Sequence, residues 1–140
     1  MRVRIKRIDN SLPLPMYQTK GAVGCDLVVR ETVVIAAGSV ARVSVNVIVE
    51  VPEGYMLLIK DRSSTAMKKG LIITAGVVDQ DFCGEEDEIK CQFFNFTSES
   101  VTVERGERIA QGIFVKVGKV EWVEVAEIKR KSRGGFGSTG

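Results

Sequence analysis

Histidine is absent from this chain of 140 residues. Its absence excludes a catalytic triad built on histidine, a histidine general base and zinc sites with imidazole ligands. Any acid–base chemistry must therefore come from carboxylates, lysine, tyrosine or cysteine. A chain of this length is expected to form one domain with a sizeable core.

Cysteine is scarce as well, with three residues at positions 25, 83 and 91. The number is odd and no pair has the spacing of a redox or metal motif, so we expect free thiols in a reducing compartment. No apolar run reaches the length of a membrane span, and the first residues lack the apolar core of a signal peptide. We therefore expect a soluble, cytoplasmic protein with no membrane partner.

Charge of one sign is not in large excess, because 20 lysines and arginines stand against 18 aspartates and glutamates. The resulting net charge of +2 does not favour a nucleic-acid groove or a membrane surface, so we expect no nucleic-acid partner. The densest basic cluster, Lys129-Arg130-Lys131 with Arg133, leads into a glycine-rich C-terminus. It is either a solvated linker or a site of attraction for a polyanionic ligand.

Short valine-rich segments make up most of the chain. The longest, Val43–Val51, alternates at period two, which is typical of a strand with one buried face, and Val120–Val125 is another candidate. Further strand candidates are 3–8, 25–29, 55–60, 71–73, 89–96, 100–103 and 109–117. Many short strands with glycine-rich turns predict a sandwich or barrel of mostly antiparallel strands.

One segment, Ser63–Gly70, has the pattern of a short helix. Serine suits its first position, Lys68 and Lys69 suit its last turn, and Gly70 suits the position after it. Because Arg62-Ser63-Ser64 stands at the helix start, these residues form either an anion site or no more than a helix cap.

A second polar run is Gly76–Glu85, where Asp79 directly follows two valines. A hairpin explains the glycines, but it explains less well a carboxylate at the end of a strand. Such a carboxylate is placed to orient a water as general base, and Phe82 is placed to form an apolar wall for a sugar or base.

Two isolated polar residues lie in apolar strands. Asp26 is either a turn carboxylate or a neighbour of a hard metal ion, most simply Mg²⁺ on a phosphate. Gln111 needs hydrogen-bond partners, which are either neighbouring backbone groups or a water beside phosphates.

The C-terminal run Arg133–Gly140 contains one cation, one aromatic ring, two hydroxyls and four glycines. It has too little apolar area to pack a core, but it has the groups that would cover an anionic ligand with a ring. The plain alternative is a disordered tail.

Taken in order, five runs resemble the five motifs of the homotrimeric dUTPase family. They are residues 24–27, 62–66, 76–85, 106–111 and 133–140. Any one match is weak, but five in order across nearly the whole chain are specific. The resemblance implies an all-β, jelly-roll-like β-barrel with one short helix over residues 1–128, and a flexible arm over 129–140. It also implies a homotrimer in which each active site draws on three chains.

The same resemblance implies Mg²⁺-dependent hydrolysis of dUTP to dUMP and pyrophosphate, which limits uracil incorporation into DNA and supplies dUMP. Asp79 would orient the water that attacks the α-phosphorus, and Asp26 would touch Mg²⁺ through water. Phe82 would pack on deoxyribose, and Phe136 would stack on uracil. The implied substrate-binding residues are Arg62, Ser63, Ser64, Gly76, Val77, Val78, Phe82, Lys90, Gln111, Arg133, Phe136, Gly137, Ser138 and Thr139.

The chain departs from the family pattern in several places. Phe82 stands where tyrosine is usual, Asp61 precedes Arg62 where a small residue is common, and Arg133 lies closer to Phe136 than usual. The run Glu86-Asp87-Glu88 looks like an insertion.

Two other functions fit this chain less well. A dCTP deaminase, which shares the fold, is disfavoured by the glycine-rich arm. A weakly catalytic, nucleotide-dependent interaction module is disfavoured by the presence of Asp79 and Arg62.

Overall fold

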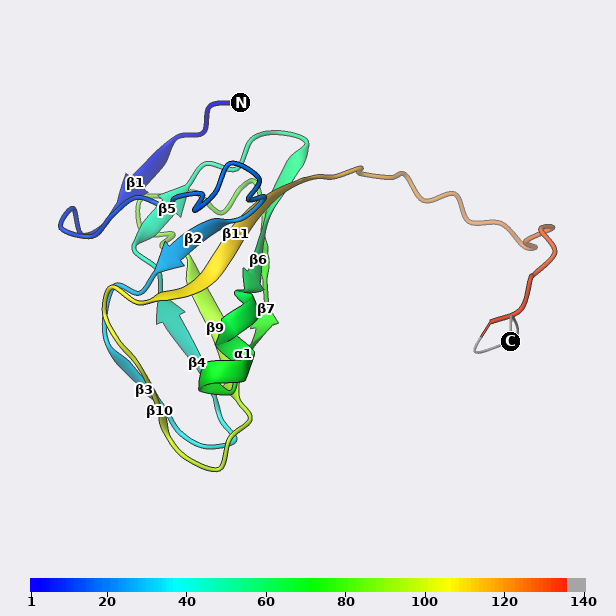
Figure 1. The fold of residues 1–140 in the computed structure, drawn as a ribbon. Helices are drawn as coiled ribbons and strands as arrows, with labels where there is room; N and C mark the ends of the chain where they lie inside the picture. The colour runs from blue at the N-terminus through cyan, green and yellow to red at the C-terminus, as the bar shows by residue number, and fades with distance from the viewer. Residues whose placement is uncertain (136–140) are drawn as a thin grey trace.

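The computed structural model describes residues 1–135, in which short strands form the body and a single short helix lies against the outside of it (Figure 1). In chain order the elements are β1 (Ile5–Arg7), β2 (Cys25–Val28), β3 (Val33–Ile35), β4 (Val40–Ser44), β5 (Val47–Val49), β6 (Tyr55–Asp61), α1 (Ser63–Lys69), β7 (Leu71–Ala75), β8 (Val77–Val78), β9 (Lys90–Asn95), β10 (Val101–Val103) and β11 (Arg108–Lys116). The predicted all-β, jelly-roll-like class with one short helix is confirmed.

Every strand pairing in the described chain is antiparallel, and most join segments far apart in the sequence. The sheets are β2-β11-β6-β8, β4-β9-β7, β1-β5 and β10-β3. In the largest sheet β11 lies between β2 and β6, with Gln111 opposite Asp26 on one side and Ala110 opposite Asp61 on the other. This register brings three distant polar segments to the same level of the sheet.

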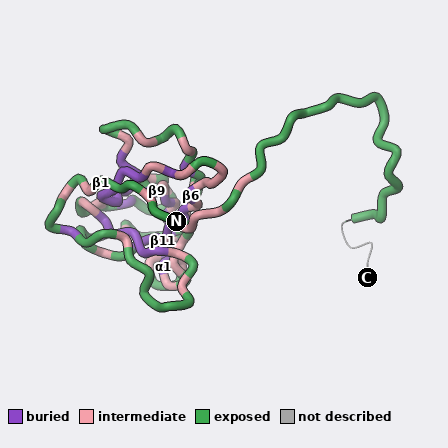
Figure 2. Tube along the Cα trace, turned by 90° about the horizontal axis from the view of Figure 1, so that it is seen from above, coloured by how far each residue is buried: buried purple, intermediate pink, exposed green. Residues whose placement is uncertain are grey.

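The core is aliphatic and is filled by alternate residues of the strands. Phe93 of β9, Val43 of β4 and Leu71 of β7 are fully buried, together with Leu27 and Ile109 from the neighbouring sheet. Figure 2 shows the buried residues gathered in the body, away from the exposed C-terminal segment. Period two was therefore the right signal for the strands that line this core.

The prediction of one strand over Val43–Val51 is wrong. β4 and β5 are separate because Asn46 has a φ of 68°, a left-handed conformation that asparagine tolerates better than most residues. The Asn46 side chain is completely buried and exchanges two hydrogen bonds with the Asp9 backbone, at 2.7 and 3.0 Å. The bend lets one valine-rich run contribute to two different sheets.

The predicted helix is confirmed, although its start differs from the prediction. Gly70 ends it in a left-handed conformation and donates its N–H to the Ala66 carbonyl at 2.9 Å. The residue at the N-cap is Arg62, not serine, and it forms no side-chain cap. Thr65 instead fastens the helix, because its buried hydroxyl donates to the Ile109 carbonyl at 2.9 Å.

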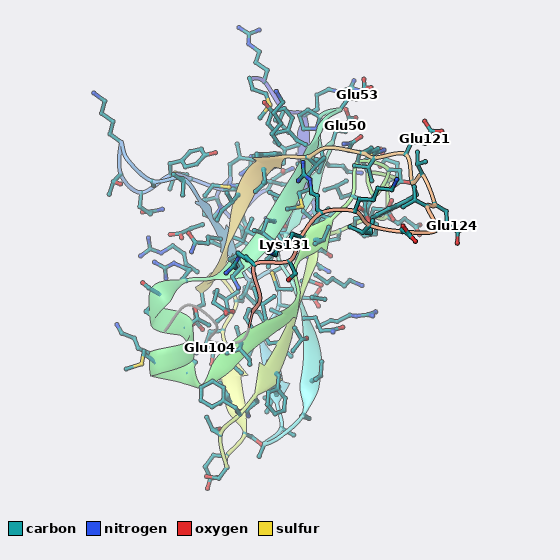
Figure 3. All side chains as sticks on the ribbon, turned by 90° about the vertical axis from the view of Figure 1, so that its right-hand side faces the viewer. Glu50, Glu53, Glu104, Glu121, Glu124 and Lys131 are labelled. Atoms are coloured by element: carbon teal, nitrogen blue, oxygen red, sulfur yellow. The ribbon has the colours of Figure 1, made fainter. Side chains whose placement is uncertain are left out.

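The strand predicted over Val120–Val125 is absent from the described chain. After β11 the last backbone bond to the body joins the Val117 N–H to the Gly54 carbonyl at 2.9 Å. Residues 118–135 are exposed throughout and extend away from the body (Figure 1). Figure 3 looks at the molecule from the side toward which this segment extends and labels Glu121, Glu124 and Lys131 on it. The predicted domain boundary at residue 128 stays a prediction.

The three cysteines are free, as expected. Cys25 and Cys91 are buried, and desolvation raises the pKa of the Cys91 thiol to about 12. Among residues 1–135, no helix has the length and apolar character needed to cross a membrane.

Asn95 offers a direct test of how loops are fixed to this core. Its buried amide donates to the carbonyls of Ile35, Ala36 and Glu99 at 2.8–3.2 Å, and its oxygen accepts from Thr97. We expect Asn95→Ala to lower the free energy of unfolding by about 2 kcal/mol or more, because buried carbonyls lose their donor.

Urea denaturation at one fixed protein concentration measures this loss. Exposed Asn10 supplies the control, because Asn10→Ala should change the midpoint little. Equal midpoints for the two variants would contradict the role assigned to Asn95.

Candidate active site

A buried carboxylate organises the first polar cluster. Asp26 on β2 is only 8% exposed. It accepts a hydrogen bond from Arg62 Nε at 2.9 Å on one oxygen and from Arg108 Nη1 at 3.2 Å on the other. Arg62 Nη1 also donates to the Arg108 carbonyl at 3.1 Å. Both guanidinium groups are thereby oriented, with further N–H groups free to point toward an anion.

Arg108 was not among the predicted site residues. It lies inside the fourth motif-like run, so its position was available, but its contact with Asp26 follows from the pairing of β11 with β2. The register places the three segments together and could not be inferred from local patterns.

Gln111 satisfies a neighbouring backbone group. Its amide donates to the Asp61 carbonyl at 2.9 Å, which supports the first of the two interpretations of this residue. Its oxygen lies against Gly24, where any Cβ would overlap it. Glycine at position 24 therefore lets the side-chain amide of Gln111 pack closely against the backbone of β2's preceding residue.

The unusual Asp61 has a structural role. One of its carboxylate oxygens accepts the Ile73 N–H of β7 at 2.8 Å. The Asp61 carboxylate thus binds the backbone of β7 at the end of β6, next to Arg62 in the sequence.

A cleft of about 250 Å³, here called the helix cleft, lies between α1 and the start of β11. Its lining includes Arg62, Ser64, Lys68 and Arg108. Ser63 does not line it. The four cations that line the cleft face two carboxylates: Glu107, which pairs with Lys69 at 2.9 Å, and Asp26, which Arg62 and Arg108 share. The excess of positive charge suits a polyanion such as a triphosphate.

A second space, the hairpin cavity of about 520 Å³, lies over residues 76–90. Its lining contains the predicted residues Gly76, Val77, Val78, Asp79, Phe82 and Lys90. It also contains Arg42, Gln92 and Glu88, which the sequence did not indicate. The volume is in the range of small-molecule sites.

Strand pairing fixes the near side of this cavity. Val77 and Val78 of β8 pair with Leu58 and Leu57 of β6. Gly76 accepts the Ile59 N–H at 2.6 Å, and any Cβ there would overlap the Ile59 carbonyl oxygen.

Beyond β8 the hairpin is open to solvent. Asp79 follows β8 directly and is exposed, and the ring of Phe82 is 41% exposed. A carboxylate and an aromatic face are therefore available to a ligand in the hairpin cavity.

The helix cleft and the hairpin cavity have no lining residue in common. In the largest sheet β6 separates β8, which bounds the cavity, from β11, which bounds the cleft. Arg133 is exposed on the extended segment, while Phe136, Gly137, Ser138 and Thr139 lie outside the described residues. Within residues 1–135, one chain brings the predicted residues together as two separate groups.

The acidic residues suit only one kind of metal binding. Across the described part of the chain, no group of three or more histidine, cysteine, aspartate or glutamate residues is arranged to hold an ion. A single carboxylate such as Asp26 would suit only Mg²⁺ that is held mainly by phosphates and waters, because such an ion needs no more than one or two protein carboxylates.

Comparison with known proteins identifies the family of this chain. The family model described as dUTPase matches residues 10–140. A protein of a Hydrogenobaculum species named deoxyuridine 5'-triphosphate nucleotidohydrolase is 42% identical over 145 aligned positions, covering 100% of this chain and 99% of the relative.

Solved structures give the same result. The fold is similar to a mutant dUTPase of Staphylococcus bacteriophage 80alpha with dUpNHpp, at a TM-score of 0.87 and 27% identity, covering 99% of this chain and 98% of that one. It is also similar to the dUTPase of Streptococcus mutans, at a TM-score of 0.75 and 33% identity, covering 84% and 98%. The match over almost the whole length and the identity to curated relatives place this chain in the dUTPase family.

Proposed function

We propose that this protein is a dUTP diphosphatase, which hydrolyses dUTP to dUMP and pyrophosphate and so limits uracil incorporation into DNA and supplies dUMP. The observation that carries the proposal is the hairpin cavity, where Asp79 stands at the end of β8 beside an exposed aromatic ring. Family membership and the naming of the similar Hydrogenobaculum protein support the choice of substrate.

In this mechanism Asp79 orients a water and accepts its proton as the water attacks the α-phosphorus. The backbone of Val77 and Val78 meets the edge of uracil, and Phe82 packs against deoxyribose, where it disfavours a 2′-hydroxyl. Lys90 lines the same cavity and adds a cation near the phosphates. Histidine is not needed, because phosphoryl transfer depends chiefly on positioning and charge neutralisation.

The helix cleft binds the polyphosphate. Arg62 and Ser64 line the cleft and contact phosphate oxygens or their waters, and Arg108 adds a second guanidinium held by Asp26. Ser63, the first residue of α1, contacts the phosphates from outside the lining of the cleft. Gln111 keeps its amide on the Asp61 carbonyl and contributes a bound water. Asp26 would hold Mg²⁺ through water, and the bound ion would supply neutralisation of the triphosphate charge.

A homotrimer joins the two groups of residues across subunit interfaces. The separate cleft and cavity of one chain support this, because each is one part of a nucleotide site. The exposed segment adds support: Trp122 is 90% exposed and Val123 is 79% exposed, in a valine-rich run that has no partner strand in its own described chain.

We further propose that this run pairs with a neighbouring copy and leads residues 129–140 to that copy's site. There Phe136 stacks on uracil, and Arg133, Gly137, Ser138 and Thr139 contact the γ-phosphate region.

Replacing Asp79 tests the chemistry. We expect Asp79→Asn to lower kcat by about 10²–10⁴-fold, because the amide keeps the shape but cannot accept the water's proton. Pyrophosphate release from dUTP measures the rate, and calorimetry with dUpNHpp should give a nearly unchanged Kd.

Asp81→Asn is the matched control, since Asp81 lies in the same hairpin without lining the hairpin cavity. An unchanged kcat in Asp79→Asn would remove this residue from the mechanism.

Substrate choice tests the proposed function itself. Wild-type protein should hydrolyse dUTP with a far higher kcat/KM than dTTP, dCTP or UTP, because the hairpin leaves no room for a methyl group, mismatches the cytosine edge and disfavours a 2′-hydroxyl. Pyrophosphate and ammonia are measured together for each nucleotide. Ammonia from dCTP would instead indicate a deaminase, and binding without either product would indicate an interaction module.

Removing residues 133–140 tests the arm. We expect turnover to fall sharply while the melting temperature stays within about 2 °C, because exposed surface residues contribute little to stability. Residues 118–135 make no contribution to the buried core, which supports the second expectation. A large fall in melting temperature, or turnover near the full-length value, would show that the C-terminus is not a closing arm.

A further inference from the structure

The run Glu86-Asp87-Glu88, which departs from the family motif, ends in a buried ion pair. Glu88 is 8% exposed. Arg30, two residues after β2, donates from Nε at 2.7 Å and from Nη2 at 2.9 Å to the two carboxylate oxygens of Glu88. Glu88 also accepts the Asn46 N–H at 2.9 Å. Its carboxylate is thus bound by three donors from two distant segments.

This pair lies at the wall of the hairpin cavity, which Glu88 lines together with Asp79 and Phe82. The next residue, Ile89, adds two backbone bonds to the body: its N–H donates to the Val47 carbonyl at 2.9 Å, and its carbonyl accepts from Val45 at 3.0 Å. The chain therefore meets the body again at positions 88–89, after leaving it at β8.

Between those two points the hairpin is weakly held. No residue from Asp79 to Asp87 is buried, although all belong to the described chain. The contacts of this stretch with the body include a bond from Gln80 Nε2 to the Tyr55 carbonyl at 2.8 Å and an exposed ion pair between Glu85 and Lys6. An exposed pair of this kind contributes little, so the buried attachment at Glu88 has the greater effect on hairpin position.

A buried ion pair seldom makes a protein more stable than apolar packing would. A bidentate pair, however, fixes both the distance and the relative orientation of its two side chains. Here the fixed element is the limb formed by residues 84–90, which faces β8 across the cavity. The spacing of the two walls decides whether a nucleoside meets a preformed site.

We propose that Glu88 and Arg30 are positioning residues, which hold the limb 84–90 so that the hairpin cavity is preformed for the nucleoside. The effect of this pair on KM rests on the proposed function. Its effect on the position of the limb can be measured in the free protein and does not depend on that function. Asp79 is held separately by the pairing of β8 with β6, so the pair acts on substrate binding and not on the chemical step.

The first test is Glu88→Gln, which keeps size and one acceptor but places an NH₂ group against an arginine donor. We expect faster hydrogen exchange at residues 80–88 of the free protein. We also expect KM for dUTP to rise on the order of tenfold, with kcat changed less than about threefold. The ratio of kcat/KM for dUTP to that for dTTP should fall as well.

Arg30 tests the pair from the other side. Arg30→Lys keeps the charge but loses the bidentate bond, so it should give a smaller KM increase than Glu88→Gln. Arg30→Met should give at least the full effect, because it leaves a buried carboxylate without its cation. If Arg30→Met does not fold, the lysine variant decides the point.

Val103→Ala is the control for lost stability, because Val103 is fully buried on β10 and does not line the hairpin cavity. Compared at equal distance below their melting temperatures, Val103→Ala should leave hairpin exchange and KM unchanged. The proposal is overturned if Glu88→Gln matches this control, or if it lowers kcat with KM unchanged.

The two proposals fail in different ways. If wild-type protein releases no pyrophosphate from dUTP, the proposed function is wrong, while hydrogen exchange of the free variants still tests the Arg30–Glu88 pair. If wild type is active and hairpin exchange in Glu88→Gln equals that of wild type, only the positioning role is wrong.

Discussion

The Asp26 carboxylate cannot lie buried and charged without partners, because desolvation of an unpaired charge costs far more than one side chain's packing gains. The partners are Arg62 and Arg108, so one residue of β2 fixes the residue before α1 and the first residue of β11. Gln111 and Gly24 then fit only in this arrangement. The positions of both arginines in the helix cleft are a consequence of this one buried group.

The largest sheet also explains why the two halves of the site are separate in one chain. β6 pairs with β11 on one side and β8 on the other, so the residues suited to phosphates and those suited to a nucleoside lie on opposite sides of the same strand. A strand keeps this separation rigid. This separation, together with the exposed apolar residues around Trp122, is the reason for the proposal that another copy of the chain completes the site.

The fold class, the helix and most strands could be predicted from the sequence because they depend on local patterns. The valine runs have the period of strands, and Gly70 marks the end of the helix. The prediction failed where residues far apart in the sequence decide the local structure. Alternation continues through Asn46 although the backbone turns there, and the run after Gly118 reads as a strand although its described chain offers no partner. The roles of Arg108 and Glu88 depend on strand register, which no single segment encodes.

Residues 1–135 contain five buried polar residues, Asp26, Asn46, Thr65, Glu88 and Asn95, and no fully buried polar side-chain atom among them lacks a hydrogen bond. Asn46, Glu88 and Asn95 lie at or beside strand ends, whereas Asp26 in β2 and Thr65 in α1 bind groups of neighbouring elements. The apolar core cannot specify these contacts, because burial of valine is non-directional, whereas a hydrogen bond fixes orientation. In this chain without histidine, directional buried contacts fix the segments around the two clefts, while the exposed Asp79 directly follows β8, which is held by its pairing with β6.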